Sequence, residues 1–276
     1  MRLHLCGVRG STPAPGPDFV RYGGHTSCVA VRHDEGPPTL VLDAGTGLRN
    51  VTALLDGQPY RGALMLGHLH WDHTQGIPFF VGGDQEGARV DVYLPKQDDE
   101  TEVLERFMSP PHFPIGVDGL NGRWTLHGLE EGERGIEGFS VLALDVPHKG
   151  GRTLGFRVEA EGASFAYLSD HSPLTFGPGP YGLGAYHENA LRLVAEVDLL
   201  IHDAQHTAEE LPARAHFGHS AAEYAVGLAC EAGARSVLLF HHDPNRTDDE
   251  LDELGRHFAD APVPVTAAAQ GGVIDL

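Results

Sequence analysis

Residues 68–73 read His-Leu-His-Trp-Asp-His and place four metal-capable side chains within six residues. The five preceding residues, 63–67, carry no polar side chain and predict a buried strand. Imidazole and carboxylate groups are the ligands that zinc and similar divalent ions prefer. The stretch therefore predicts a metal site at the C-terminal edge of a sheet, which a histidine-rich surface loop explains less well.

The spacing of these four side chains divides them into two pairs. His68 and His70 lie two residues apart, and such residues share one face of an extended segment, so both can reach one ion. Asp72 and His73 follow where the chain turns, and they point elsewhere. This division indicates two ions rather than one.

The composition is that of a globular protein, with 41% hydrophobic and 21% charged residues among 276. The net charge of −20 argues against non-specific binding to DNA or RNA, although it does not exclude a small anionic substrate. No apolar run approaches the ~18 residues of a membrane helix. The three cysteines, Cys6, Cys28 and Cys230, form no CxxC pair and predict buried, reduced thiols in a cytoplasmic protein.

Hydrophobic patterning predicts two groups of strands, each followed by helices. Strands are expected at residues 2–8, 27–33, 39–43, 63–67, 90–94, 124–129, 139–146, 153–159, 164–168, 199–201, 237–240 and 263–267. Helices are expected up to residue 55 and at residues 98–108, 188–197, 220–232 and 248–259. The order predicts a four-layer αββα sandwich of the α/β (α+β) class. No linker or short repeat interrupts it, so residues 1–276 are expected to form a single domain.

Further candidate ligands stand at the ends of expected strands. His148 follows the strand at 139–146, Asp170 follows the strand at 164–168, and His241 and His242 follow the strand at 237–240. A single histidine at a strand end is usually an ordinary polar residue. Several such residues beside a four-ligand motif support one another as parts of a two-metal site.

In this order, the ligand motifs resemble those of the metallo-β-lactamase superfamily over nearly the whole chain. The resemblance implies one ion held by His68, His70 and His148, a second held by Asp72, His73 and the final histidine, and a bridge made by Asp170. Residues 238–241, Leu-Leu-Phe-His, are similar to the strand ending of the phosphodiesterase branch, which favours His241 as the final ligand. The alternative is His242.

Three features are similar to the tRNase Z and cyclic phosphodiesterase branch of that superfamily. Asp170 stands where β-lactamases proper often have cysteine. Gly-His-Ser at 218–220 resembles a segment whose histidine lies beside the scissile phosphate, and Ile-His-Asp-Ala at 201–204 resembles a His-Glu-Ala-Thr segment. The resemblance implies that Asp203 holds His219 protonated, that His219 either stabilises the developing charge or protonates the leaving oxygen, and that Asp72 assists proton movement. Asp43 is expected to orient the motif loop.

Other segments depart from tRNase Z. Residues 43–48 read Asp-Ala-Gly-Thr-Gly-Leu instead of Asp-x-Gly-Glu-Gly-Thr, and no long glycine-rich arm is present. Residues 22–28 and 108–114 look instead like a bacterial and archaeal group of cyclic-phosphodiesterase-like hydrolases.

The resemblance thus implies a hydrolase with two divalent ions, zinc or manganese, acting on cyclic nucleotides, cyclic phosphates or short nucleic-acid phosphodiesters. The alternatives are a thioester or lactone hydrolase, a tRNase Z-like endoribonuclease, and a metal-binding or sensing protein without turnover. The sequence leaves the oligomeric state open, a homodimer included.

Overall fold

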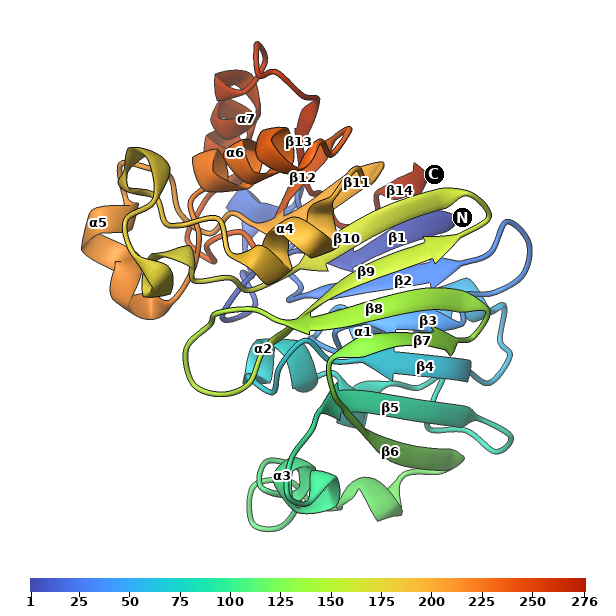
Figure 1. Ribbon diagram of the computed structural model, residues 1–276. Coiled ribbons are helices and arrows are strands. Elements are labelled where there is room, and N and C mark those ends of the chain that lie inside the picture. The colour runs from blue at the N-terminus through green and yellow to red at the C-terminus, as the bar shows by residue number, and fades with distance from the viewer.

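Two seven-stranded β-sheets form the centre of the protein in the computed structural model, which describes residues 1–276 (Figure 1). The first sheet has the order β14 (Val273–Asp275), β1 (Arg2–Gly7), β2 (Cys28–Arg32), β3 (Leu40–Leu42), β4 (Arg61–Met65), β5 (Arg89–Pro95) and β6 (Arg123–Leu129). The second has the order β13 (Val265–Ala267), β12 (Val237–Phe240), β11 (Leu199–Asp203), β10 (Ala163–Leu168), β9 (Leu154–Ala160), β8 (Phe139–Asp145) and β7 (Gly132–Ile136). Each half of the chain therefore supplies one sheet, except that the last strand returns to the first.

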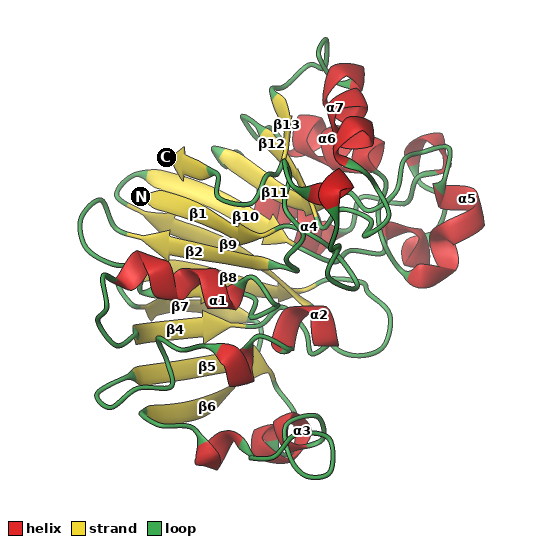
Figure 2. Cartoon of the chain, turned by 180° about the vertical axis from the view of Figure 1, so that it is seen from behind, coloured by secondary structure: helices red, strands yellow, loops and turns green.

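Helices cover the outer face of each sheet. The helices of the chain are α1 (Leu48–Val51), α2 (Trp71–Thr74), α3 (Glu100–Glu105), α4 (Glu188–Val194), α5 (Leu211–Arg214), α6 (Ala222–Ala232) and α7 (Asp248–His257). Apolar side chains of α1 and α3 pack on the first sheet, and Figure 2 shows α1 lying across it. Helices α4, α6 and α7 pack on the second sheet. The result is the αββα sandwich that the sequence predicts. No helix is both long enough and apolar enough to span a membrane.

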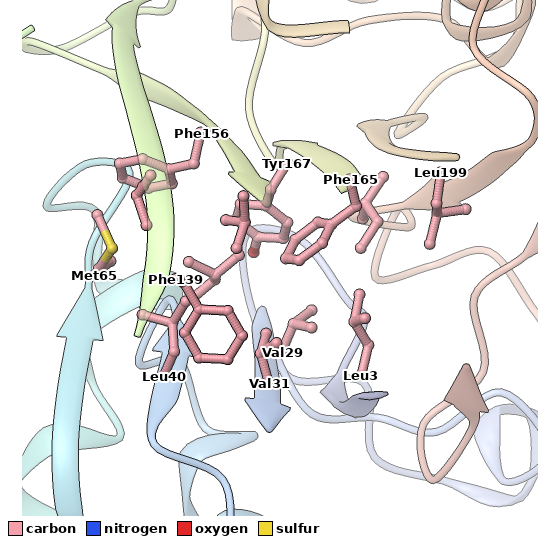
Figure 3. Packing of buried hydrophobic residues seen from close by; sticks show 14 of the residues in the cluster. Leu3, Val29, Val31, Leu40, Met65, Phe139, Phe156, Phe165, Tyr167 and Leu199 are labelled. Atoms are coloured by element: carbon pink, nitrogen blue, oxygen red, sulfur yellow. The ribbon is translucent and has the colours of Figure 1, made fainter. Parts of the chain in front are cut away.

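The facing surfaces of the two sheets share one apolar core of 25 buried residues. Figure 3 shows Leu3, Val29, Val31, Leu40 and Met65 from the first sheet opposite Phe139, Phe156, Phe165, Tyr167 and Leu199 from the second. Each such large side chain contributes about 1.5–3 kcal/mol when it is removed from water. This burial fixes the sheets against each other and so fixes the strand ends that carry the site.

Several predicted boundaries are wrong. The helix expected at residues 98–108 is only Glu100–Glu105, capped by the Asp99 side chain, and the chain then turns before the two prolines at 110 and 111. The helices expected at 188–197 and 220–232 are shorter, covering Glu188–Val194 and Ala222–Ala232. Cys230 is exposed rather than buried, since the inward face of α6 is filled by its neighbour Ala229.

Two edge strands and two short helices, α2 and α5, were not predicted. The strand at Val265–Ala267 is not the last, because Val273–Asp275 adds β14 antiparallel to β1. The segment Gly132–Ile136 carries two glycines and two charges yet pairs with β8 as strand β7. Helix α5 is a single turn. Such short or polar elements lack a hydrophobic period, so tertiary contacts define them.

Candidate metal centre

Parallel pairing brings the candidate ligands to one edge of the second sheet. Strands β10, β11 and β12 run parallel to one another, so their C-terminal ends lie together. Asp170 follows β10, Asp203 ends β11, and His241 follows β12. His148 follows β8, which lies in the same sheet beyond β9. Residues 68–73, which follow β4 of the first sheet, lie opposite these side chains and complete the group.

The motif itself changes from extended chain to helix at His70. His70 has φ −64° and ψ 155°, and it immediately precedes the single turn of α2. The turn carries Asp72 and His73, both buried, whereas Trp71 is 73% exposed. This change of direction separates the first two ligands from the next two, which is the division expected from their spacing.

One group of ligand atoms gathers around His70. Its Nδ1 lies 2.9 Å from Nε2 of His68 and 3.3 Å from Nε2 of His148. Oδ1 of Asp170 lies 3.8 Å from Nε2 of His68 and 3.6 Å from Nε2 of His148. Three imidazole nitrogens and one carboxylate oxygen thus converge on a single point.

A second group gathers at the other carboxylate oxygen of Asp170. Oδ2 of Asp170 lies 3.0 Å from Nε2 of His73 and 3.3 Å from Nε2 of His241. Oδ2 of Asp72 lies 3.3 Å and 3.1 Å from the same two nitrogens. Asp170 therefore presents one oxygen to each group.

Hydrogen bonds fix which ring nitrogen His73 and His148 present to the centre. Nδ1 of His73 donates to Oδ2 of Asp43 over 2.7 Å, and Nδ1 of His148 donates to the carbonyl of Gly218 over 2.8 Å. Asp43 also accepts from Tyr167 Oη at 2.8 Å and from the backbone N–H of Gly67 at 2.9 Å. Such partners orient metal-binding imidazoles and leave Nε2 free for the ion.

The arrangement of these donor atoms suits binding to divalent cations better than hydrogen bonding between the side chains. Nε2 of His73 and Oδ2 of Asp170 approach closely, yet both are buried without a hydrogen-bond partner. Unpartnered buried polar atoms are costly, and a shared cation removes that cost. Three imidazole nitrogens at hydrogen-bonding distance from one another in the first group point to the same conclusion. The residues present therefore fit a metal centre with room for ions on both sides of Asp170.

The protonation states agree with this assignment. Burial lowers the pKa of His68, His70 and His148, so these rings stay neutral and keep their lone pairs. Burial also lowers the pKa of His241, but the carboxylates of Asp170 and Asp72 outweigh it and raise that pKa to about 9. In the absence of metal, protons supply the positive charge that divalent ions supply in the loaded site.

The choice between the two final histidines is visible in the structure. His241 points its Nε2 into the second group, with a left-handed backbone φ of 56°. Nε2 of His242 instead donates to the carbonyl of Ala268 over 2.9 Å, and burial lowers the pKa of His242 to about 3. His242 therefore faces away from the candidate centre.

His219 and Asp203 lie directly beside the ligand groups. Nδ1 of His219 is 3.0 Å from Oδ2 of Asp203 and 3.6 Å from Oδ1 of Asp170. Burial raises the pKa of Asp203, but the neighbouring His219 outweighs it and lowers that pKa. Asp203 also accepts from the backbone N–H groups of His171 and Gln205, which fixes its orientation. The pair is thus held rigidly at the edge of the metal centre.

Comparison with known proteins decides the family. The sequence signature of the beta-lactamase superfamily domain matches residues 39–242, a range that holds every candidate ligand. The chain belongs to the metallo-β-lactamase superfamily. A ribonuclease Z from Exiguobacterium sibiricum is 38% identical over 263 residues, covering 82% of this chain and 85% of the relative. This likeness places the chain in the phosphodiesterase branch of the superfamily, among metal-dependent hydrolases.

Solved structures show the same superfamily fold. The metallo-β-lactamase fold protein YhfI from Bacillus subtilis has a TM-score of 0.73 at 18% identity, covering 99% of both chains. A diphosphatase from the PhnP family has a TM-score of 0.70 at 18% identity, covering 100% of this chain and 97% of that one.

Sequence reasoning missed the loop after β1, which lies over the superfamily motif. The backbone N–H of Ser11 donates to Oδ2 of Asp72 over 2.6 Å, and Nε2 of Gln205 donates to Oγ of Ser11 over 2.9 Å. Gly10 packs so closely on the ring of His241 that a Cβ there would lie 2.9 Å from Cγ and nearer still to two other ring atoms. The only signal in the sequence is the glycine- and proline-rich composition of this loop, because the contacts use backbone atoms.

A cavity of about 790 Å³ opens over the centre. Its lining includes the ligands His70, Asp72, His148 and Asp170 together with His219, Trp71, Gln205 and Arg214. Arg214, on α5, is half-exposed and pairs with Asp243. The cavity is large enough for a small ligand, and the Arg214–Asp243 ion pair forms part of its wall.

Proposed function

We propose that the protein is a phosphodiesterase that uses two divalent ions to hydrolyse small anionic phosphodiesters. The proposed substrates are cyclic nucleotides, cyclic phosphates and short nucleic-acid ends. The observation that carries the proposal is the position of Asp170, which presents one oxygen to each ligand group beside the His219–Asp203 pair. Zinc suits the all-histidine and aspartate donor set, and manganese is the alternative.

In this proposal each ligand group holds one ion and Asp170 is shared. One ion belongs to His68, His70 and His148, and the other to Asp72, His73 and His241. Bound ions of this kind generate a nucleophile from water at neutral pH and polarise phosphoryl oxygens. Asp43 holds the ring of His73 in the orientation that this requires.

Side chains beside the candidate metals then provide for proton transfer to the leaving oxygen. Asp203 accepts a hydrogen bond from Nδ1 of His219, which orients the ring and leaves Nε2 to serve the leaving oxygen. Asp72 accepts a hydrogen bond from the backbone of Ser11 through Oδ2, so its orientation is fixed while it assists proton movement. Arg214 lines the same cavity, where it is paired with Asp243. His219 is thus the proposed general acid, and Asp203 is its positioning residue.

Small substrates are favoured by the charge of the whole protein. A net charge of −20 opposes non-specific binding to long polyanions, whereas bound cations dominate the field inside the site. The three cysteines are all unpaired, which supports a reducing, cytoplasmic location as part of the proposal.

A ribonuclease Z-like endoribonuclease is the second candidate function. The 38% identity to the Exiguobacterium sibiricum ribonuclease Z favours it. Its discriminating substrate is a tRNA precursor with a 3′ trailer, assayed beside 2′,3′-cyclic nucleotides at equal metal concentration. Faster cleavage of the precursor would select this second candidate.

Hydrolysis of bis(p-nitrophenyl) phosphate by metal-loaded protein tests the proposal. We expect His219→Ala to lower kcat by about 10²–10⁴-fold, the range for loss of a general acid, with unchanged metal content. His257→Ala is the control, because His257 lies on α7 outside the site. Full activity in His219→Ala would contradict the proposed role. Faster hydrolysis of nitrocefin or S-lactoylglutathione would instead favour another esterase or lactamase chemistry.

A further inference from the structure

A second cavity, of about 550 Å³, adjoins the catalytic one. Leu69 and Trp71 line both cavities, so the indole of Trp71 stands between them. The remaining walls come from α3 and the segments beside it, through Val103, Leu104 and Phe107. Nothing in the proposed hydrolytic steps uses this second cavity.

The position of Trp71 is unusual for a large apolar side chain. Its backbone is fixed between two candidate ligands, His70 and Asp72, yet its side chain is 73% exposed. An exposed indole held in this way offers a flat face next to the reacting centre. Aromatic faces of this kind stack on nucleobases with little regard to base identity.

The charge of the second cavity differs from that of the protein. Its polar lining consists of Gln75, Arg106 and His112, with no carboxylate among the lining residues, although the chain as a whole carries −20 and Arg106 pairs with Glu102 beside the cavity. The catalytic cavity, by contrast, is lined by Asp72, Asp170 and Asp243. Apolar walls with amide, guanidinium and imidazole groups suit a planar heterocycle that has hydrogen-bonding edges. A plain alkyl group would leave these polar groups unused.

We propose that the second cavity binds the nucleobase of the substrate, stacked on Trp71, while the phosphodiester lies at the metal centre. The natural substrate is then a nucleoside phosphodiester rather than a phosphorylated sugar or a lipid diester. This inference rests on the proposed function, because it takes the same centre as the place of reaction. It adds the substrate class that the metal ligands do not specify.

Fluorescence of Trp71 tests the inference without any turnover. The chain has two tryptophans, so Trp124→Phe leaves Trp71 as the sole indole. We expect adenosine 5′-monophosphate to quench this fluorescence saturably and ribose 5-phosphate, which lacks the base, to leave it unchanged. Val103→Glu, which places a carboxylate in the apolar wall, should weaken the binding of adenosine 5′-monophosphate by roughly 10-fold or more. The matched control is Val81→Glu, since Val81 is 61% exposed and lies outside both cavities.

Inhibition of bis(p-nitrophenyl) phosphate hydrolysis gives a second readout. Trp71→Leu should raise the inhibition constant of adenosine 5′-monophosphate by roughly 10-fold and leave that of ribose 5-phosphate unchanged. Equal quenching by both ligands, or equal inhibition in Trp71→Leu and the parent, would overturn the nucleobase site. Base-dependent quenching in a protein that hydrolyses no phosphodiester would refute the proposed function and leave the binding site standing.

Discussion

Replacing Gly10 by alanine adds one methyl group against the ring of His241. The new Cβ would lie 2.9 Å from Cγ of His241, where ordinary contact begins at 3.4 Å, and two other ring atoms would be closer. The ring must therefore retreat by roughly 1 Å, a displacement that costs about 10²-fold in rate at a reacting centre. Gly10 does not have a positive φ, so alanine strains no backbone there and the effect is steric. We expect Gly10→Ala to lose about 100-fold in kcat/KM.

The assay combines bis(p-nitrophenyl) phosphate turnover with metal content per chain. We expect weaker retention of the ion assigned to Asp72, His73 and His241, and normal retention of the other. Gly255→Ala is the control, because a Cβ at Gly255 on α7 meets no atom within 4 Å. Thermal unfolding of both variants separates misfolding from a local effect. A well-folded Gly10→Ala protein with parental activity and metal content would refute the assignment of His241 as a ligand.

Three further substitutions test the surroundings of the centre. Asp43→Asn should weaken metal affinity by about 10–100-fold, measured by competition with a chromogenic chelator, because His73 loses its carboxylate partner; an unchanged affinity would contradict that role. Asp203→Asn should lower kcat while metal content stays constant, because His219 loses the carboxylate that orients its Nδ1, and an unchanged kcat would contradict that positioning role. Thr247→Ala removes the capping box with Glu250 at the start of α7 and should cost about 1 kcal/mol in urea unfolding, without loss of activity; a neutral result would mean that this helix end contributes nothing to stability.

The sequence predicted the layers of the fold because strand and helix periods are local properties. It also predicted that ligands would gather, since candidate ligands stand at the ends of several expected strands. The contacts of Gly10 and Ser11 could not be foreseen, because they use a missing side chain and a backbone N–H. The same holds for β14, whose three residues become a strand only through pairing with β1.

The different orientations of the His241 and His242 rings also became visible only in the structure. The resemblance favoured His241, and the structure shows the ring of His241 turned toward Asp170 from a residue with a left-handed backbone. The second cavity likewise could not be predicted, because it is lined by residues of α2 and α3, which lie too far apart in the chain for any local motif to connect them.

The number of ions per chain tests the central claim most directly. Protein purified without chelator is analysed for zinc and manganese by mass spectrometry, beside Asp170→Ala prepared in the same way. We expect two ions per chain in the parent and fewer in the variant, because Asp170 presents one oxygen to each ligand group. A well-folded parent protein that retains one ion or none, even after incubation with excess zinc or manganese, would contradict it.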